Sequence, residues 1–192
     1  MHGQRRLDGL RVAILVTDAV EQVEMAEPRA ALDAAGARTR IVPPKPGQVQ
    51  GMQHDVTADT FPVDLTLGQA KPDDFDAVLL PGGALNADSL RVHRGAQAFV
   101  RRMQEREKPI AVICHAPWLL VSAGLARGRT LTSYPTLQDH VRNAGGQRVD
   151  REVVGDGNRV SSRQPADIPA FAREMTALLA EHRGRQGKRS AA

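Results

Sequence analysis

The chain has 192 residues, a formal net charge of +4, a hydrophobic share of 41% and one cysteine. This length fits a single domain with its own core, and no apolar run approaches the roughly 18 residues that a membrane-spanning helix needs. A lone cysteine excludes an intrachain disulfide, which favours a cytoplasmic location, and the short apolar stretch at 12–16 lacks the cleavage site of a signal peptide.

Short apolar runs alternate with longer amphipathic segments along the chain. We expect strands at residues 11–16, 38–42, 76–80, 109–113 and 130–132, then a hairpin of 152–154 with 159–161. We expect helices at 22–35, 95–104, 116–123, 136–143 and 167–182, with Asp167 as the N-cap of the last one, and a loop or small hairpin at 43–62. This alternation predicts an α/β fold in which helices cover a parallel sheet.

The positive charge is concentrated at the C-terminal end. Residues 183–192 hold Arg183, Arg185, Lys188 and Arg189 and no acidic residue. We interpret this segment as a basic flexible tail after a single domain at 7–182. Such a tail can bind acidic partners, but it has no aromatic side chain to stack on bases, so we do not expect nucleic acid as a partner.

The sharpest candidate site follows the predicted strand at 109–113, which runs directly into Cys114, His115 and Pro117. Ligands of parallel sheets gather beyond the carboxyl ends of the strands, and Pro117 suits a first helical turn. Free N–H groups at a helix start favour the thiolate of Cys114, and His115 is a candidate proton carrier. The alternatives are a buried cysteine that acts as a small hydrophobe and a histidine on the surface.

A second feature is Pro81-Gly82-Gly83, which follows the predicted strand at 76–80. Two glycines allow a close backbone approach, and the N–H of Gly83 together with that of His115 forms a candidate oxyanion hole. The simpler interpretation is a plain turn. Neither a dinucleotide-binding nor a P-loop motif occurs, so we expect no cofactor.

Three acidic residues, Glu21, Glu24 and Glu27, lie near the start of the first predicted helix. They suit a solvated face at a helix N-terminus. The functional interpretation is that one of them faces Cys114, keeps its proton through a raised pKa and donates a hydrogen bond to the sulfur. The histidines show no ligand spacing with each other or with Cys114, so we expect no metal site.

Taken together, these segments resemble the ThiJ/PfpI superfamily, most closely its PfpI-type intracellular protease and general stress protein branch. The resemblance is carried by VAILVTDAVEQVEMAEP at 12–28, FDAVLLPGG at 75–83 and KPIAVICHAPWLL at 108–120. It extends over nearly the whole domain. It implies a flavodoxin-like three-layer α/β/α sandwich with a mainly parallel central sheet. It also implies a homo-oligomer, and we expect a dimer.

The resemblance also assigns roles to residues. Cys114 matches the reactive cysteine, His115 the histidine after it, and Glu24 the carboxyl that hydrogen-bonds the thiol. Glu21 matches a second acid of the pocket, and Gly82 and Gly83 belong to the oxyanion-type loop.

The sequence departs from the family pattern after this loop. Some relatives use a Glu from a neighbouring subunit there to orient the histidine, and only Asp88 can substitute for it in this chain. This departure weakens a protease triad.

The function implied by the resemblance is that of a stress-response protein. Its reactive cysteine would act on small carbonyl compounds such as methylglyoxal, or on their glycated adducts, as a deglycase or cofactor-free glyoxalase. The alternatives are a non-catalytic oxidative-stress sensor or chaperone and an intracellular cysteine peptidase.

Overall fold

A six-stranded sheet forms the centre of the protein. The structure is a computed structural model, which describes the backbone of residues 6–190 and the side chains of residues 6–187. The spatial order of the strands is β10-β11-β7-β6-β1-β3, and only β10 runs antiparallel to its neighbour. Every residue of β6 and β7 is buried, as expected for strands covered on both faces. The strand bounds are β1 Arg11–Leu15, β3 Arg38–Val42, β6 Ala77–Leu80, β7 Ile110–Ile113, β10 Val153–Asp156 and β11 Arg159–Ser162.

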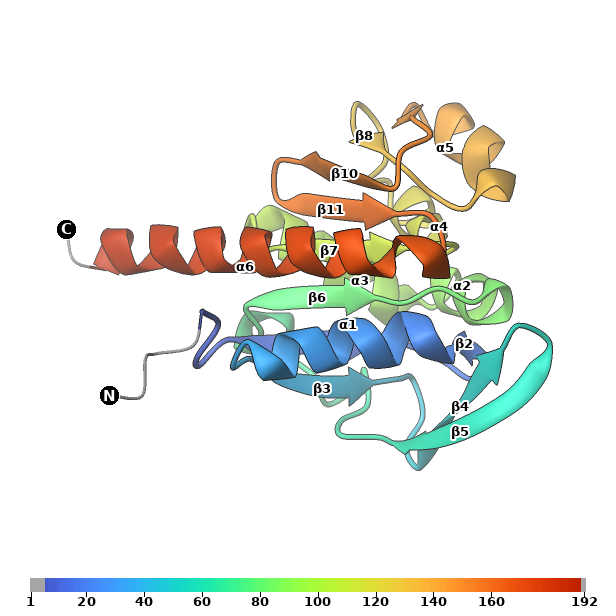
Figure 1. Cartoon of the computed structure of the whole chain (residues 1–192), viewed down its shortest axis with the longest axis horizontal. Helices are drawn as coiled ribbons and strands as arrows, with labels where there is room; N and C mark the ends of the chain where they lie inside the picture. Colours follow the sequence, from blue (N-terminus) through green and yellow to red (C-terminus); the bar gives the residue numbers. More distant parts are fainter. Residues whose placement is uncertain (1–5, 191–192) are drawn as a thin grey trace.

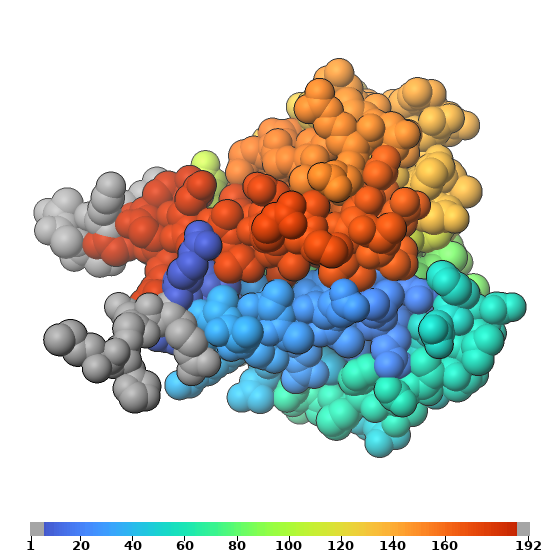
Figure 2. Space-filling model, viewed as in Figure 1, coloured from blue at the N-terminus to red at the C-terminus, as the bar shows by residue number. Residues whose placement is uncertain are grey.

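Helices cover both faces of this sheet. On one face, α1 (Gln22–Ala34) and α6 (Ile168–Ser190) lie side by side, as Figures 1 and 2 show. On the other face lie α2 (Ala84–Arg91), α3 (Arg94–Glu105) and α4 (Pro117–Ser122). These three layers confirm the predicted flavodoxin-like sandwich.

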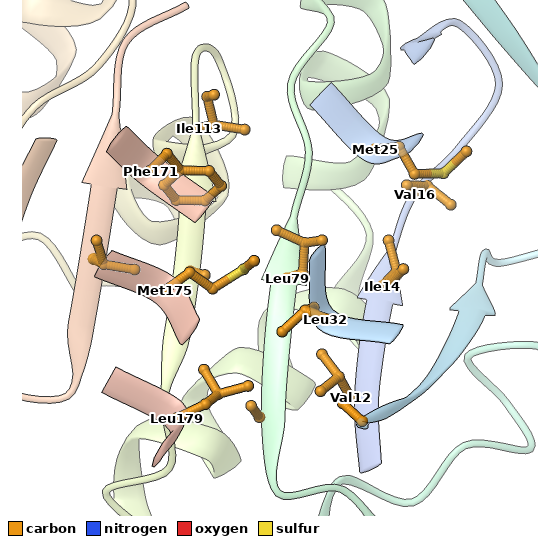
Figure 3. Close-up of a cluster of buried hydrophobic side chains, with 14 of the residues drawn as sticks. Val12, Ile14, Val16, Met25, Leu32, Leu79, Ile113, Phe171, Met175 and Leu179 are labelled. Carbon is orange, nitrogen blue, oxygen red and sulfur yellow. The ribbon is translucent and has the colours of Figure 1, made fainter. Parts of the chain in front are cut away.

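The larger core cluster lies between the sheet and the helices α1 and α6. Phe171, Met175 and Leu179 recur every four residues along α6 and are almost completely buried (Figure 3). This spacing places them on one face of the helix, against Leu79 and Ile113 of the central strands. The core therefore fixes the direction in which α6 crosses the sheet.

Smaller elements surround the carboxyl end of the sheet. The segment at 43–62 forms the hairpin of β4 (Gln48–Gln53) and β5 (Val56–Pro62), and β4 pairs with the short β2 (Val20–Glu21). Figure 1 shows this hairpin projecting beyond the ends of the parallel strands. The remaining elements are β8 Thr130–Leu131, β9 Gln147–Arg148, α5 Gln138–Asn143 and 3-10 turns at Pro72–Asp74, Pro135–Leu137 and Pro165–Asp167.

The structure differs from the sequence prediction in two helices. The helix α2 was not expected: it starts without a side-chain cap and buries the polar Asn86 beside only two apolar residues, so its hydrophobic pattern is weak. The last helix was expected to end at 182, but α6 continues to Ser190 through the segment interpreted as a flexible tail. Asp167 directly precedes α6 as predicted, and its carboxylate accepts hydrogen bonds from Arg163 at 2.8 and 3.1 Å.

No helix in the part of the chain that the structure describes combines the length and apolar character needed to span a membrane.

Truncating Phe171 tests the packing of α6. Phe171 is fully buried, so Phe171→Ala should lower the free energy of unfolding by about 3–5 kcal/mol, measured by chemical denaturation. Val92→Ala is the matched control, because Val92 is 63% exposed, and it should change the stability by less than about 0.5 kcal/mol. Equal effects of the two substitutions would show that α6 does not pack as described.

Candidate active site

Cys114 occupies the sharp turn between β7 and α4. Its φ of 63° lies in the left-handed region, which is uncommon for a residue other than glycine and recurs at functional sites. The Cys114 N–H donates to Ser162 O at 3.1 Å, and its carbonyl accepts from the Tyr134 N–H at 2.8 Å. Hydrogen bonds on both sides of the residue therefore hold the strained turn in place.

A cavity of about 450 Å³ opens at this turn, beyond the carboxyl ends of β1, β6 and β7. Cys114 lines it although the residue is only 6% exposed, so the sulfur is buried but not sealed. The β4–β5 hairpin supplies one wall. This size suits a small molecule or a modified side chain. The lining residues are Ala19, Glu21, Glu24, Met52, His54, Asp55, Gly83, Ala84, Leu85, Cys114, His115, Tyr134 and Pro165.

The imidazole of His115 faces the sulfur. Its Nδ1 lies 3.2 Å from Cys114 Sγ, and its Nε2 lies 3.4 Å from Thr136 Oγ1. The ring of Tyr134 stacks on it with the centroids 4.5 Å apart. Burial lowers the pKa of His115, which favours a neutral ring at neutral pH. With its proton on Nε2, the ring donates to Thr136 and can accept a proton from the thiol.

Glu24 brings a fully buried carboxyl to the other side of the sulfur, from the first turn of α1. Burial raises the pKa of Glu24 to about 8, and the charge of Glu21 adds to this effect. Contacts with the Cys114 thiol and the Gly82 backbone lower it by smaller amounts. Neither carboxyl oxygen meets a partner among the described residues at full hydrogen-bond geometry. Glu24 is therefore neutral at neutral pH and holds a proton that it can donate.

The charge state of Cys114 departs from the sequence prediction. Burial raises the pKa of the Cys114 thiol, and the charge of an ionised Glu24 and a hydrogen bond with it raise it further. The backbone N–H groups of Gly83 and His115 lower the pKa, but less. The helix start alone therefore does not produce the thiolate that we expected, because desolvation of the sulfur opposes it.

Glu24 and Cys114 titrate as one coupled pair, and the pair's first ionisation has to be assigned to one of them. A carboxylate on Glu24 would be fully buried without well-formed hydrogen bonds, whereas a thiolate faces two backbone N–H groups. The repulsion that raises the pKa of Cys114 also exists only once Glu24 is ionised. We therefore place the first negative charge of the pair on the sulfur and the retained proton on Glu24.

The two glycines after β6 allow this arrangement. A Cβ on Gly82 would lie 2.2 Å from Glu24 Oε2 and 2.6 Å from Cys114 Cβ. Gly83 has a φ of 92°, and a Cβ there would lie 2.6 Å from Ala19 O. Both positions therefore require glycine. The backbone N–H groups of Gly83 and His115 face the Cys114 sulfur. Their role as an oxyanion hole for a substrate oxygen stays a prediction.

The other candidate acids lie in different places. Glu21 lines the cavity, and its Oε2 accepts from the His54 backbone N–H at 3.1 Å. Glu27 is exposed, in line with the solvated interpretation. Asp88 lies on α2, outside the cavity of its own chain, and pairs with Arg91 at 3.0 Å. A role for Asp88 at the site requires a second subunit and stays a prediction.

Several site residues were not found from the sequence. Asn86 donates to Pro81 O and Gly82 O at 3.1 and 2.9 Å and accepts from the Thr17 N–H at 2.6 Å, which fixes the glycine loop. Tyr134 and Thr136 reach His115 from the segment after β8. Within residues 6–190, no cluster of His, Cys, Asp and Glu side chains is arranged to hold a metal ion.

The raised pKa of Glu24 predicts a pH-dependent stability. The folded state keeps this proton up to about pH 8, whereas the unfolded chain releases it near 4.5, so the free energy of unfolding should fall by a few kcal/mol as the pH rises between these values. Glu24→Gln removes the titration, so the variant should lose less stability than the wild type between about pH 5 and about pH 8 in denaturant melts. Parallel pH profiles for the two proteins would contradict a buried, protonated Glu24.

The charge assignment predicts how fast Cys114 reacts with iodoacetamide. With the first charge on the sulfur, the alkylation rate should rise with pH about the midpoint of the pair's first ionisation, because the thiolate is the form that reacts. Glu24→Leu removes the donated proton and should raise this midpoint by at least about one pH unit. A wild-type thiol that stays inert until above about pH 10 would place the charge on Glu24 instead.

Known proteins are similar to this chain over most of its length. The model of the DJ-1/PfpI family matches residues 10–178. A deglycase of Pyrococcus abyssi is 42% identical over 170 residues, which cover 88% of this chain and 99% of the relative. General stress protein 18 of Bacillus subtilis is 38% identical over 173 residues, with coverage of 89% and 98%.

A solved structure agrees with these relatives. The crystal structure of DJ-1beta from Drosophila melanogaster has a TM-score of 0.81 and 28% identity, and the match covers 95% of this chain and 98% of that one. The family match extends from the strand before the acidic helix to the core residues of α6 and so includes the whole candidate site. The chain therefore belongs to the DJ-1/PfpI family.

Proposed function

We propose that this protein is a cysteine-dependent deglycase, which releases amines from their adducts with small dicarbonyl compounds such as methylglyoxal. One observation carries the proposal: Cys114 Sγ lines an open cavity between a neutral imidazole at 3.2 Å and a buried carboxyl whose pKa is about 8. A nucleophile with a proton donor and a proton acceptor beside it is suited to carbonyl chemistry. The relatives named deglycase and general stress protein support this assignment.

The first step exchanges the amine for the sulfur. Cys114 Sγ forms a bond to the adduct carbon that carries the hydroxyl group, the carbon–nitrogen bond breaks, and the amine leaves with a proton from Glu24. The product is a hemithioacetal on Cys114. Free methylglyoxal reaches the same species when the sulfur adds to its aldehyde carbon and the carbonyl oxygen takes up the proton.

The next steps move protons only. A base removes the proton from the carbon bonded to sulfur, and a proton returns to the neighbouring carbon, which converts the hemithioacetal to a thioester of lactate. Water then cleaves the thioester, which gives lactate and restores the thiol. The net reaction is adduct plus water to amine plus lactate, without an external oxidant. His115 and Glu24 are the groups beside the sulfur that can carry these protons.

The resemblance implies a homodimer, and the lone cysteine favours a cytoplasmic location. We propose both for this protein, with Asp88 as the acid that one subunit offers to the site of the other. Leu85 supports such a contact, because it lies on the rim of the cavity and is 66% exposed.

The activity is tested with a preformed adduct of methylglyoxal and an N-acetylated amino acid. The wild type should release free amine and lactate in equal amounts, and Cys114→Ser should lower the rate by about 100-fold or more, because it removes the nucleophile. Asp139→Asn is the control and should keep full activity, since Asp139 is 78% exposed on α5.

The same assay separates a deglycase from a glyoxalase. A glyoxalase removes only free methylglyoxal, so it cannot release amine faster than the adduct dissociates in buffer. Amine release above that spontaneous rate supports the deglycase. Equal rates for wild type and Cys114→Ser would overturn the proposal for both activities.

A further inference from the structure

A second cavity, of about 380 Å³, lies at the opposite end of the sheet from Cys114. It is bounded by the turn between β10 and β11, the end of α3 and the last turns of α6. Figure 1 shows this end of α6 extending past the starts of the parallel strands, whereas the Cys114 turn follows the end of β7. The residues that matter here are Gln104, Arg106, Arg129, Gly157, His182 and Arg185.

Three arginines line this cavity, one directly after α3, one before β8 and one on α6, and Glu107 is the only acid that lines it with them. Arg106 and Arg129 have acidic neighbours outside the lining, but at 3.7 Å from Asp73 and 3.5 Å from Asp156. These separations leave both guanidinium groups with unused donors. Arg185 forms no ion pair with any side chain that the structure describes.

The wall behind the cavity adds a fourth positive charge. Arg159 is 8% exposed and donates to Gln104 Oε1 from two of its nitrogens, at 3.0 and 2.7 Å. Burial lowers its pKa to about 10, the charge of Arg129 lowers it further, and the charge of Asp156 opposes the shift. The two arginines therefore repel each other, and an anion between the cavity arginines would relieve this repulsion.

The turn at Gly157 and the side chains of His182 and Gln186 complete the lining. The turn at Gly157 has a φ of 62° and lies against the Arg129 guanidinium, because a Cβ there would be 3.4 Å from Arg129 Nη1. His182 is 8% exposed, and the amide of Gln186 lies 2.8 Å from its Nε2. A cavity with convergent charges and a few fixed polar groups has the make-up of a binding site for a small ligand.

We propose that this cavity binds a small phosphate-bearing anion, of the class of pyrophosphate or a phosphate monoester. Guanidinium groups match phosphate oxygens in pairs, and three arginines from separate segments line this cavity. Because Arg185 belongs to α6, a bound anion also holds the end of this helix against the domain. The basic segment after 182 thus contributes to a site within the fold.

The test is isothermal titration of the full-length protein with pyrophosphate at low ionic strength. Arg185→Gln and Arg106→Gln should each weaken binding by about tenfold, the effect of losing one charge-assisted contact. Arg38→Gln is the matched control: Arg38 is exposed at the start of β3 and does not line this cavity, so the variant should bind as the wild type does. The unliganded melting temperature of each variant verifies its folding.

Four outcomes would overturn the proposal. The first is no binding at millimolar pyrophosphate, and the second is an equal loss for Arg38→Gln, which would indicate a diffuse basic surface. The third is tighter binding of a single-stranded oligonucleotide, which would make the region a nucleic-acid surface. The fourth is protection of Cys114 from iodoacetamide by pyrophosphate, which would place the anion in the other cavity. Inorganic phosphate and a sugar phosphate, titrated separately, distinguish the free ion from the monoester.

Discussion

A carboxyl and a thiol buried against each other form the constraint on which the site depends. Placing Glu24 where it is 0% exposed costs free energy unless it stays protonated, and its pKa of about 8 reflects that cost. The backbone must also approach closely, which only glycine at position 82 permits. The chemistry of the site and the loss of stability at rising pH thus have the same origin, which is the proton that the fold keeps on Glu24.

The parallel sheet brings the groups of this site together. The segment after β1 leads to the acidic start of α1, β6 ends at the glycine loop, and β7 ends at Cys114. These three strands are neighbours in the sheet, so their carboxyl ends converge although the residues are far apart in sequence. Asn86 and the hydrogen bonds of the Cys114 backbone then fix the loops, which keeps the strained turn from relaxing.

The sequence was sufficient to predict the parts of the fold with a strong local signal. The apolar strands and the Cys114 turn follow from residue pattern alone, whereas the role of Glu24 among the three acidic residues came from the family resemblance. It was not sufficient for Tyr134 and Thr136, which reach His115 only through the return of the chain after β8. The direction of the Cys114 pKa shift was also missed, because desolvation depends on how deeply the finished fold buries the sulfur. Local sequence patterns do not show how deeply the sulfur of Cys114 is buried.

The two ends of the sheet differ in charge. Acidic side chains surround the Cys114 cavity, whereas arginines surround the cavity at the end of α6. Helix α6 connects them. Pro165, just before it, lines the first cavity, and Arg185, about 25 Å beyond the first residue of α6 at 1.5 Å per residue, lines the second. The screening length in physiological salt is about 8 Å, so neither set of charges acts on the other through solvent. An anion at the arginines can therefore influence the Cys114 site only mechanically, through the packing of α6.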